Sequence, residues 1–126
     1  MRQAVCALII RNGKILSVSR RYDPNNIGLP GGKVDGDESL EHAIKREVME
    51  ETGYNIEVLS IVAEDIDGEF FVTTFHCRII DGGPCNTKET GVVKFVDYND
   101  LINPEKSSFH AYNLLLKEKM PVEFYL

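Results

Sequence analysis

The chain has 126 residues, and 14 Lys and Arg against 20 Asp and Glu give it a formal net charge of −6. This balance argues against an extended nucleic-acid surface and against binding to an anionic membrane, since both need basic surface. No apolar run approaches the roughly 20 residues of a membrane span, and the N-terminus does not resemble a signal peptide. Three cysteines without a CxxC pair favour a reduced, cytoplasmic protein, and the length predicts a single domain over residues 1–126.

The start of the chain is predicted to form a β-hairpin followed by a loop. Apolar runs over residues 3–10 and 14–20 flank Asn12 and Gly13, and both turn residues tolerate the positive φ that a tight hairpin needs. Residues 22–32, with the sequence YDPNNIGLPGG, are dense in Pro, Gly and Asn, which is typical of a loop.

A helix is expected from about residue 38 to residue 52. Either Asp37 or Ser39 can supply the N-cap oxygen, and acidic residues occupy the first turn. Gly53 stands where a left-handed residue commonly ends a helix. Both ends of this helix are therefore predicted from local sequence.

The rest of the chain is predicted to add strands and a second helix. Residues 55–63 and 70–80 are expected to be strands, and the second is rich in aromatic and β-branched residues. A turn is expected at residues 81–86 and a short strand at 92–97. Residues 107–120 carry apolar residues at helical spacing and predict a second helix. Strands on either side of a helix indicate an α/β fold with a mixed sheet packed between helices.

Acidic residues concentrate in residues 32–54. This segment holds seven acidic and three basic residues, so it carries four of the six net negative charges. On a helical wheel of about 100° per residue, Glu47 and Glu51 fall within about 20° of Leu40, in the middle of the apolar stripe, and Glu50 lies at its edge. An ordinary amphipathic helix would carry apolar residues in that stripe.

Two interpretations of this acidic face differ in what compensates its charge. Glutamates related by i, i+3 and i+4 are neighbours and repel one another. The first interpretation is a solvated face paired with Lys45 and Arg46. The second is a site for Mg²⁺ or Mn²⁺, because hard divalent cations bind carboxylate oxygens, and Mg²⁺ keeps waters for a substrate's phosphates. The placement of Glu47 and Glu51 on the core side of the helix favours the metal site.

A tight turn at Gly31 and Gly32 precedes the acidic helix. Glycines let backbone amides and carbonyls approach an ion or a phosphate closely. The G-x4-G-K-[ST] spacing of a P-loop is absent. The glycine pair by itself is therefore compatible with a plain turn as well as with a ligand-binding one.

The segment 32–54 resembles the signature of the Nudix hydrolases, G-x5-E-x7-R-E-U-x-E-E-x-G-U, in which U is a bulky aliphatic residue. The matching positions are Gly32, Glu38, Arg46, Glu47, Val48, Glu50, Glu51, Gly53 and Tyr54. All the fixed letters match without a gap, and Tyr54 departs from the pattern only at a packing position. The length of the chain, the preceding hairpin and the following strands also resemble small MutT-like members.

The resemblance implies a fold and a reaction. The fold is an α/β/α sandwich with a mixed β-sheet between helices, and the Nudix box lies at residues 32–54 of a single domain. The reaction is hydrolysis of a nucleoside diphosphate linked to another group X, by attack of water on phosphorus, with Mg²⁺ or Mn²⁺ as the cofactor. The expected substrates are nucleoside triphosphates or their modified forms, cleaved to monophosphate and pyrophosphate.

The resemblance also assigns roles to residues of the box. Those expected at the metal are Gly31, through its backbone carbonyl, Glu47, Glu50 and Glu51. Arg46 would orient a glutamate of this cluster, while Glu38 and Gly32 would support the site from behind it. The general base is either a glutamate of the box, with Glu50 as the candidate, or Glu89 in the loop beyond the box.

Side chains outside the box are candidates for binding the nucleotide. They are Arg20, Arg21, Tyr22, Phe71 and His110. The strand-end arginines suit a phosphate or a base, the aromatic rings suit stacking on a base, and His110 falls near a base-reading position of MutT-like proteins. Each has an ordinary alternative, because such arginines and histidines are often solvated and aromatic rings often fill a core.

Two classes of function follow from the resemblance. The first is a catalytic Nudix hydrolase, in which ADP-ribose-type and capped-RNA substrates are alternatives to nucleoside triphosphates. The second is a non-catalytic Nudix domain that binds a nucleotide, which the complete set of box glutamates disfavours. In both, the expected partner is a nucleotide, with no membrane and no extended nucleic-acid surface, and the protein is expected to be a monomer or a homodimer.

Overall fold

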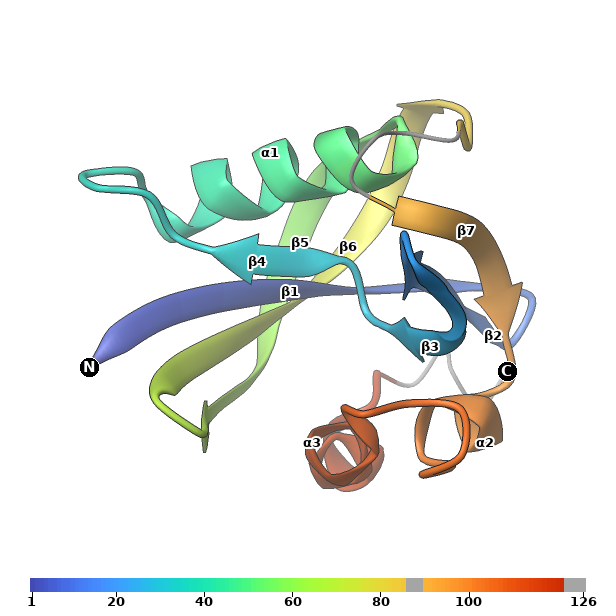
Figure 1. Cartoon of the computed structure of the whole chain (residues 1–126). Helices are drawn as coiled ribbons and strands as arrows, with labels where there is room; N and C mark the ends of the chain where they lie inside the picture. The colour runs from blue at the N-terminus through green and yellow to red at the C-terminus, as the bar shows by residue number, and fades with distance from the viewer. Residues whose placement is uncertain (86–89, 122–126) are drawn as a thin grey trace.

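The computed structural model describes residues 1–85 and 90–121. It contains a mixed β-sheet with helix α1 (Leu40–Thr52) on one face and helices α2 (Tyr98–Leu101) and α3 (His110–Leu115) on the other (Figure 1). This arrangement confirms the expected α/β class with helices on both sides of a sheet. No helix in the described part of the chain is long and apolar enough to cross a membrane.

Strands β1 (Arg2–Arg11) and β2 (Lys14–Arg20) form the predicted hairpin. Antiparallel pairing brings Arg11 opposite Lys14. Between them, Asn12 and Gly13 have φ angles of 52° and 74°, which match the twist of a two-residue hairpin turn. The hairpin prediction is confirmed.

Residues 22–32 contain two strands where a loop was expected. β3 (Asp23–Gly28) pairs antiparallel with β2, and β4 (Gly31–Lys33) pairs antiparallel with β1. The local composition favours irregular structure, but the two neighbouring strands offer backbone donors and acceptors with which this segment can pair. The loop prediction was wrong because tertiary pairing overrides local propensity here.

Helix α1 begins two residues after the expected start and ends where expected. Ser39 supplies the N-cap, and its side chain accepts a hydrogen bond from the backbone N–H of His42. Gly53 adopts the left-handed conformation, with φ 82°, and donates its N–H to Met49. The buried residues of this helix are Ala43, Ile44, Val48, Glu51 and Thr52. A glutamate therefore lies on the core face, as the helical wheel predicts.

Strands β5 (Tyr54–Asp67) and β6 (Phe70–Gly82) form a long antiparallel pair, and both extend beyond the predicted strands. β6 also pairs in parallel with β1, which makes the sheet mixed. The turn expected at residues 81–86 overlaps the end of β6, and residue 86 lies outside the described residues.

Strand β7 (Thr90–Val96) pairs antiparallel with β2, in agreement with the strand expected at residues 92–97. The strand order is β3-β2-β1-β6-β5, with β4 also paired to β1 and β7 also paired to β2. β1 is therefore the strand that joins the two halves of the sheet, and β4 runs beside α1 (Figure 1).

The helix predicted over residues 107–120 is divided. It consists of the six-residue α3 and a 3-10 turn, η1 (Lys117–Lys119), and α2 was not predicted. Ser107 is buried, and its hydroxyl donates to the carbonyl of Ile27 in β3. Because this contact holds the segment before α3 against β3, the expected first turn of the helix does not form.

Two apolar clusters fill the spaces on either side of the sheet. Alternate residues of β1 serve both, since Val5 and Ala7 belong to the cluster beneath α1, whereas Cys6 and Leu8 pack with the cluster beneath α2 and α3. Val5 and Cys6, which point to opposite faces of the sheet, both line the cleft of the candidate site.

Candidate active site

The turn before α1 brings a glycine backbone against two glutamates of that helix. The N–H of Gly31 lies 3.3 Å from each carboxylate oxygen of Glu51 and donates to them. A Cβ atom on Gly32 would lie 2.6 Å from the carboxylate carbon of Glu47, closer than a Cβ atom ordinarily approaches another atom. Glycine at position 32 therefore lets the Glu47 carboxylate approach the backbone, while Gly31 supplies the N–H that Glu51 accepts.

Glu51 is a buried carboxylate, with 8% of its surface exposed. Burial raises the pKa of its carboxyl to about 9, and the neighbouring Glu47 carboxylate acts in the same direction. Without a compensating cation, Glu51 therefore holds a proton at neutral pH. This property distinguishes it from a carboxylate on a solvated helix face.

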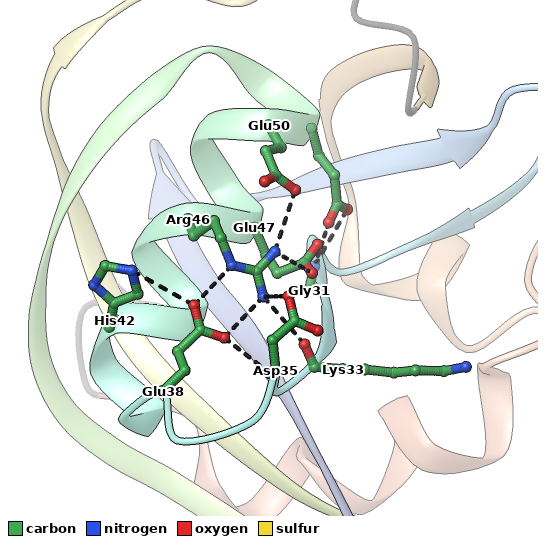
Figure 2. A network of polar contacts seen from close by, with 9 residues as sticks. Gly31, Lys33, Asp35, Glu38, His42, Arg46, Glu47 and Glu50 are labelled. Carbon is green, nitrogen blue, oxygen red and sulfur yellow. Dashed lines mark hydrogen bonds and ion pairs between the residues drawn. The ribbon is translucent and has the colours of Figure 1, made fainter.

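Arg46 is the centre of a polar network on the outer side of the same helix (Figure 2). Its Nε and Nη2 donate to the two carboxylate oxygens of Glu38 at 2.7 Å and 2.9 Å. Its Nη1 donates to Glu47 at 3.0 Å and to Glu50 at 3.3 Å, and its Nη2 also donates to the carbonyl of Lys33 at 3.2 Å. The guanidinium lowers the pKa of Glu38 to about 2. The Arg46 guanidinium thus links Glu38 in the loop before α1, the backbone of β4, and Glu47 and Glu50 of α1.

The carboxylates of Glu47 and Glu51 are suited to bind a divalent cation, although their arrangement is not that of a complete coordination site. Within residues 1–85 and 90–121, no three His, Cys, Asp or Glu side chains already converge as a metal-binding group, and Glu50 points towards Arg46 (Figure 2). Glu47 and Glu51 supply oxygen donors beside a cradle that a Cβ on Gly32 would fill. These donors fit Mg²⁺ or Mn²⁺, and the assignment of Gly31 and the three glutamates as ligands stays a prediction.

A cleft of about 430 Å³ opens beside these carboxylates, within the size range of small-molecule sites. One part is acidic and is formed by Gly31, Gly32, Glu47 and Glu51. The apolar residues that line it from the sheet include Ala4, Val72 and Phe70, and α3 contributes Tyr112 and Asn113. The basic side chains among the described lining residues are Arg20 and Lys33. The cleft therefore combines an acidic region with apolar and aromatic walls and two cations.

A hydrogen-bonded chain lies in the wall between β1 and α3. Cys6 Sγ lies 3.0 Å from Thr74 Oγ1, which lies 2.7 Å from the hydroxyl of Tyr112. Burial raises the pKa of the Cys6 thiol to about 11, so this thiol is protonated at neutral pH and is a poor nucleophile. The arrangement suits attack by water better than covalent catalysis by this cysteine.

The predicted nucleotide-binding residues separate into two groups. Arg20 lines the cleft. The side chain of Arg21 lies over the ring of Tyr22, which is 88% exposed, and neither residue is among the described lining residues. Phe71 also does not line the cleft, and His110 bonds through Nδ1 to the carbonyl of Ser107. Glu89 lies outside the described residues.

Sequence reasoning missed several residues that line the cleft. Phe70 lines it where Phe71 was expected, because successive side chains of β6 point to opposite faces of the sheet. Phe109, within the segment expected to be a long helix over residues 107–120, lies just before α3 and at the cleft, next to Gly28 of β3. Burial does not alternate along β6, where Phe70 and Phe71 are both half-buried and the six residues that follow are all buried, so no local signal separates these two residues or places Phe109.

The comparison with protein families agrees with this geometry. The family model for the NUDIX domain matches residues 1–117 of this chain. The chain belongs to the Nudix hydrolase family. Its Nudix box therefore contains the glutamates that α1 presents to the cleft.

Relatives of this Nudix domain carry several names. It is 30% identical over 115 residues to a MutT-like protein of Streptomyces ambofaciens, covering 89% of this chain and 73% of that protein. It is 31% identical over 106 residues to an ADP-ribose pyrophosphatase of Methanocaldococcus jannaschii, covering 78% of this chain and 63% of that one. A match of 55 residues at 36% identity to a putative nudix hydrolase of Caenorhabditis elegans covers 43% of this chain and only 15% of that protein.

A solved structure gives the same fold. The crystal structure of a MutT NUDIX hydrolase from Burkholderia pseudomallei superposes with a TM-score of 0.74 at 27% identity, covering 92% of this chain and 97% of that chain. Agreement over nearly the full length of both chains extends the similarity beyond the box to the strands and helices that surround the cleft.

Proposed function

We propose that this Nudix domain is a Mg²⁺-dependent nucleotide pyrophosphohydrolase. Its substrates are nucleoside diphosphates linked to a group X. Among these, the favoured substrates are nucleoside triphosphates or their modified forms, which the enzyme cleaves to a nucleoside monophosphate and pyrophosphate. The observation that carries the proposal is the placement of the buried Glu51 and of Glu47 against Gly31 and Gly32 at the acidic part of the cleft. The names of the relatives support it as well.

Some residues of the box would bind the metal, and others would hold those metal ligands in position. Glu47, Glu50 and Glu51 would hold Mg²⁺, with Mn²⁺ as a substitute, and the bound metal would supply charge neutralisation on the phosphates. Arg46 would fix the position of Glu47 and Glu50, and Glu38 would fix Arg46. Either Glu50 or Glu89 would remove the proton from the attacking water.

A second candidate within the same chemistry is an ADP-ribose pyrophosphatase. It is favoured by the M. jannaschii relative of that name and by a crystal structure of an ADP-ribose pyrophosphatase from Streptococcus suis, which superposes with a TM-score of 0.77 at 26% identity. Both candidates hydrolyse a pyrophosphate bond beside a nucleoside. We further propose that the protein acts in the cytoplasm as a single domain.

A substrate panel tests the proposal and separates the two candidates. The protein is incubated with Mg²⁺ or Mn²⁺ and with the common nucleoside triphosphates, 8-oxo-dGTP or ADP-ribose, and the products are resolved by anion-exchange chromatography. We expect nucleoside monophosphate from at least one substrate, and none after chelation of the metal. If the protein binds a nucleotide but hydrolyses none of these substrates, the proposed enzymatic function is refuted, and the protein is instead a non-catalytic nucleotide-binding domain.

A further inference from the structure

The side chains of Arg20 and Phe109 meet at the cleft, although they are far apart in the sequence. We infer that this pair is the surface against which the nucleobase of the substrate stacks. The inference rests on the proposed function for its ligand, a nucleotide, and adds the residues that distinguish a nucleotide from the same phosphate without a base.

The segment that carries Phe109 is firmly attached to β3. The backbone N–H of Ile27 donates to the carbonyl of Lys106 at 2.9 Å, and the hydroxyl of Ser107 donates to the carbonyl of Ile27 at 2.5 Å. The backbone N–H and the hydroxyl of Ser108 lie 2.9 Å and 3.0 Å from Asn26 Oδ1 and donate to it. These four bonds fix the backbone immediately before Phe109, so its ring needs little ordering when a ligand binds.

Glycine at position 28 makes room for the ring. A Cβ atom on Gly28 would lie 2.8 Å from Cδ2 of Phe109 and 3.3 Å from Cε2. The ring therefore packs directly on the backbone of β3. Despite this packing, Phe109 remains 36% exposed and lines the cleft, so an apolar aromatic surface is available to a ligand.

Arg20 completes the surface from the end of β2. Its guanidinium carbon lies 5.5 Å from the centre of the Phe109 ring. Within the described part of the chain the Arg20 guanidinium forms no ion pair, and it lies against the Phe109 ring. A guanidinium plane held against an aromatic ring is a stacking surface for a base. Every base has a π face, so such a surface recognises that a base is present more than which base it is.

The same cleft contains Gly31, Glu47 and Glu51. A nucleotide whose phosphates lie at these residues would have its base in the part of the cleft lined by apolar and aromatic groups. Arg20 and Phe109 are thus placed to act on binding, whereas the box residues are placed to act on the reaction.

The chain offers a matched control for this pair. Arg11 ends β1 as Arg20 ends β2, and its guanidinium carbon lies 4.9 Å from the centre of the Phe95 ring. Neither Arg11 nor Phe95 is among the described residues that line the cleft. Removing Arg11 therefore removes the same kind of contact at a place where no nucleotide is expected.

The test measures how much the base contributes to binding. Calorimetric titrations with Mg²⁺ compare the four common nucleoside monophosphates with ribose 5-phosphate, in the wild type and in Phe109→Leu, Phe109→Tyr, Arg20→Met and Arg11→Met. In the wild type, the base should tighten binding by at least about 5-fold, as expected for one stacked base. Phe109→Leu and Arg20→Met should remove most of this difference, while Phe109→Tyr and Arg11→Met should keep it.

The outcomes separate this inference from the proposed function. If the wild type binds no nucleotide more tightly than ribose 5-phosphate, or if Phe109→Leu and Arg20→Met keep the full difference, the stacking surface is refuted. If base-dependent binding is lost in these variants but no nucleotide is hydrolysed by the wild type, the inference stands and the proposed hydrolase fails. Arg20→Met changes an exposed side chain, so it provides a folded variant even if Phe109→Leu is unstable.

Discussion

Arg46 and Glu38 form a two-point ion pair, with Nε 2.7 Å from one carboxylate oxygen of Glu38 and Nη2 2.9 Å from the other. The same guanidinium reaches Glu47 and Glu50, so Glu38 fixes the plane of the group that orients two proposed metal ligands. A bidentate pair of this kind restrains both orientation and distance.

Glu38→Gln should lower kcat by about 10-fold to 100-fold, because it releases Arg46 and so loosens Glu47 and Glu50. KM for the nucleotide should change little. Steady-state kinetics at saturating Mg²⁺ measure both constants. Glu57→Gln is the matched control, since Glu57 forms an exposed pair with Arg78 at 2.8 Å on the β5–β6 hairpin. Equal losses in the two variants would contradict the role given to Glu38.

Glu51→Gln should lower kcat by about 100-fold or more while the protein stays folded. The change removes a proposed metal ligand but also removes a buried acid that interacts unfavourably with Glu47. Kinetics and Mn²⁺ binding followed by electron paramagnetic resonance measure the loss. Glu41→Gln, an exposed glutamate on the same helix, should change neither. An active Glu51→Gln enzyme would remove Glu51 from the proposed metal site.

The stability of the metal-free protein should fall as the pH rises from about 5 to about 9. The folded pKa of Glu51 is about 9, above its ordinary value of 4.5, so between these values the folded state holds a proton that the unfolded state has lost. Stability then decreases with rising pH. Thermal melts in EDTA measure this slope, which should be weaker in Glu51→Gln. Added Mg²⁺ should stabilise the wild type most at the alkaline end, and a flat wild-type profile in EDTA would contradict the buried carboxylate.

Gly31→Ala and Gly32→Ala should fail in different ways. A Cβ on Gly31 would overlap the backbone carbonyl of Val5 and the Cα of Cys6. Neither backbone group can easily move, so this change should destabilise the fold by more than about 2 kcal/mol. The atoms nearest to a Cβ on Gly32 would all belong to the carboxylate of Glu47. This carboxylate lies at the end of a side chain and can rotate away. Gly32→Ala should therefore fold but bind Mn²⁺ more weakly, as denaturant titration and metal titration can measure. Normal metal affinity in a folded Gly32→Ala protein would show that the position of Glu47 does not matter.

Glu89→Gln should lower kcat and change the pH dependence of the reaction if Glu89 is the general base. The pH profile of kcat at saturating Mg²⁺ measures this, with Glu105→Gln as an exposed control. A profile like that of the wild type would return the role to the box, with Glu50 as the candidate.

Local sequence determined the features that depend on spacing and on single turns. The hairpin at Asn12 and Gly13 follows from residues that tolerate positive φ, and the helix from Ser39 to Gly53 follows from its caps. The helical repeat alone placed Glu51 on the core face of that helix, and the structure buries it there. These properties are local because hydrogen bonds and side-chain directions within a helix or a turn depend on near neighbours.

Tertiary structure decided which residues outside the box meet at the cleft. Strands β3 and β4 form only because β2 and β1 offer them pairing edges, and the register of β6 turns Phe70 rather than Phe71 to the cleft. Phe109 reaches Arg20 because Ser107 bonds to Ile27, about 80 residues earlier in the chain. The net charge of −6 and the box motif could thus be interpreted from the sequence, whereas the surface proposed to receive the base depends on contacts between distant segments that no local pattern specifies.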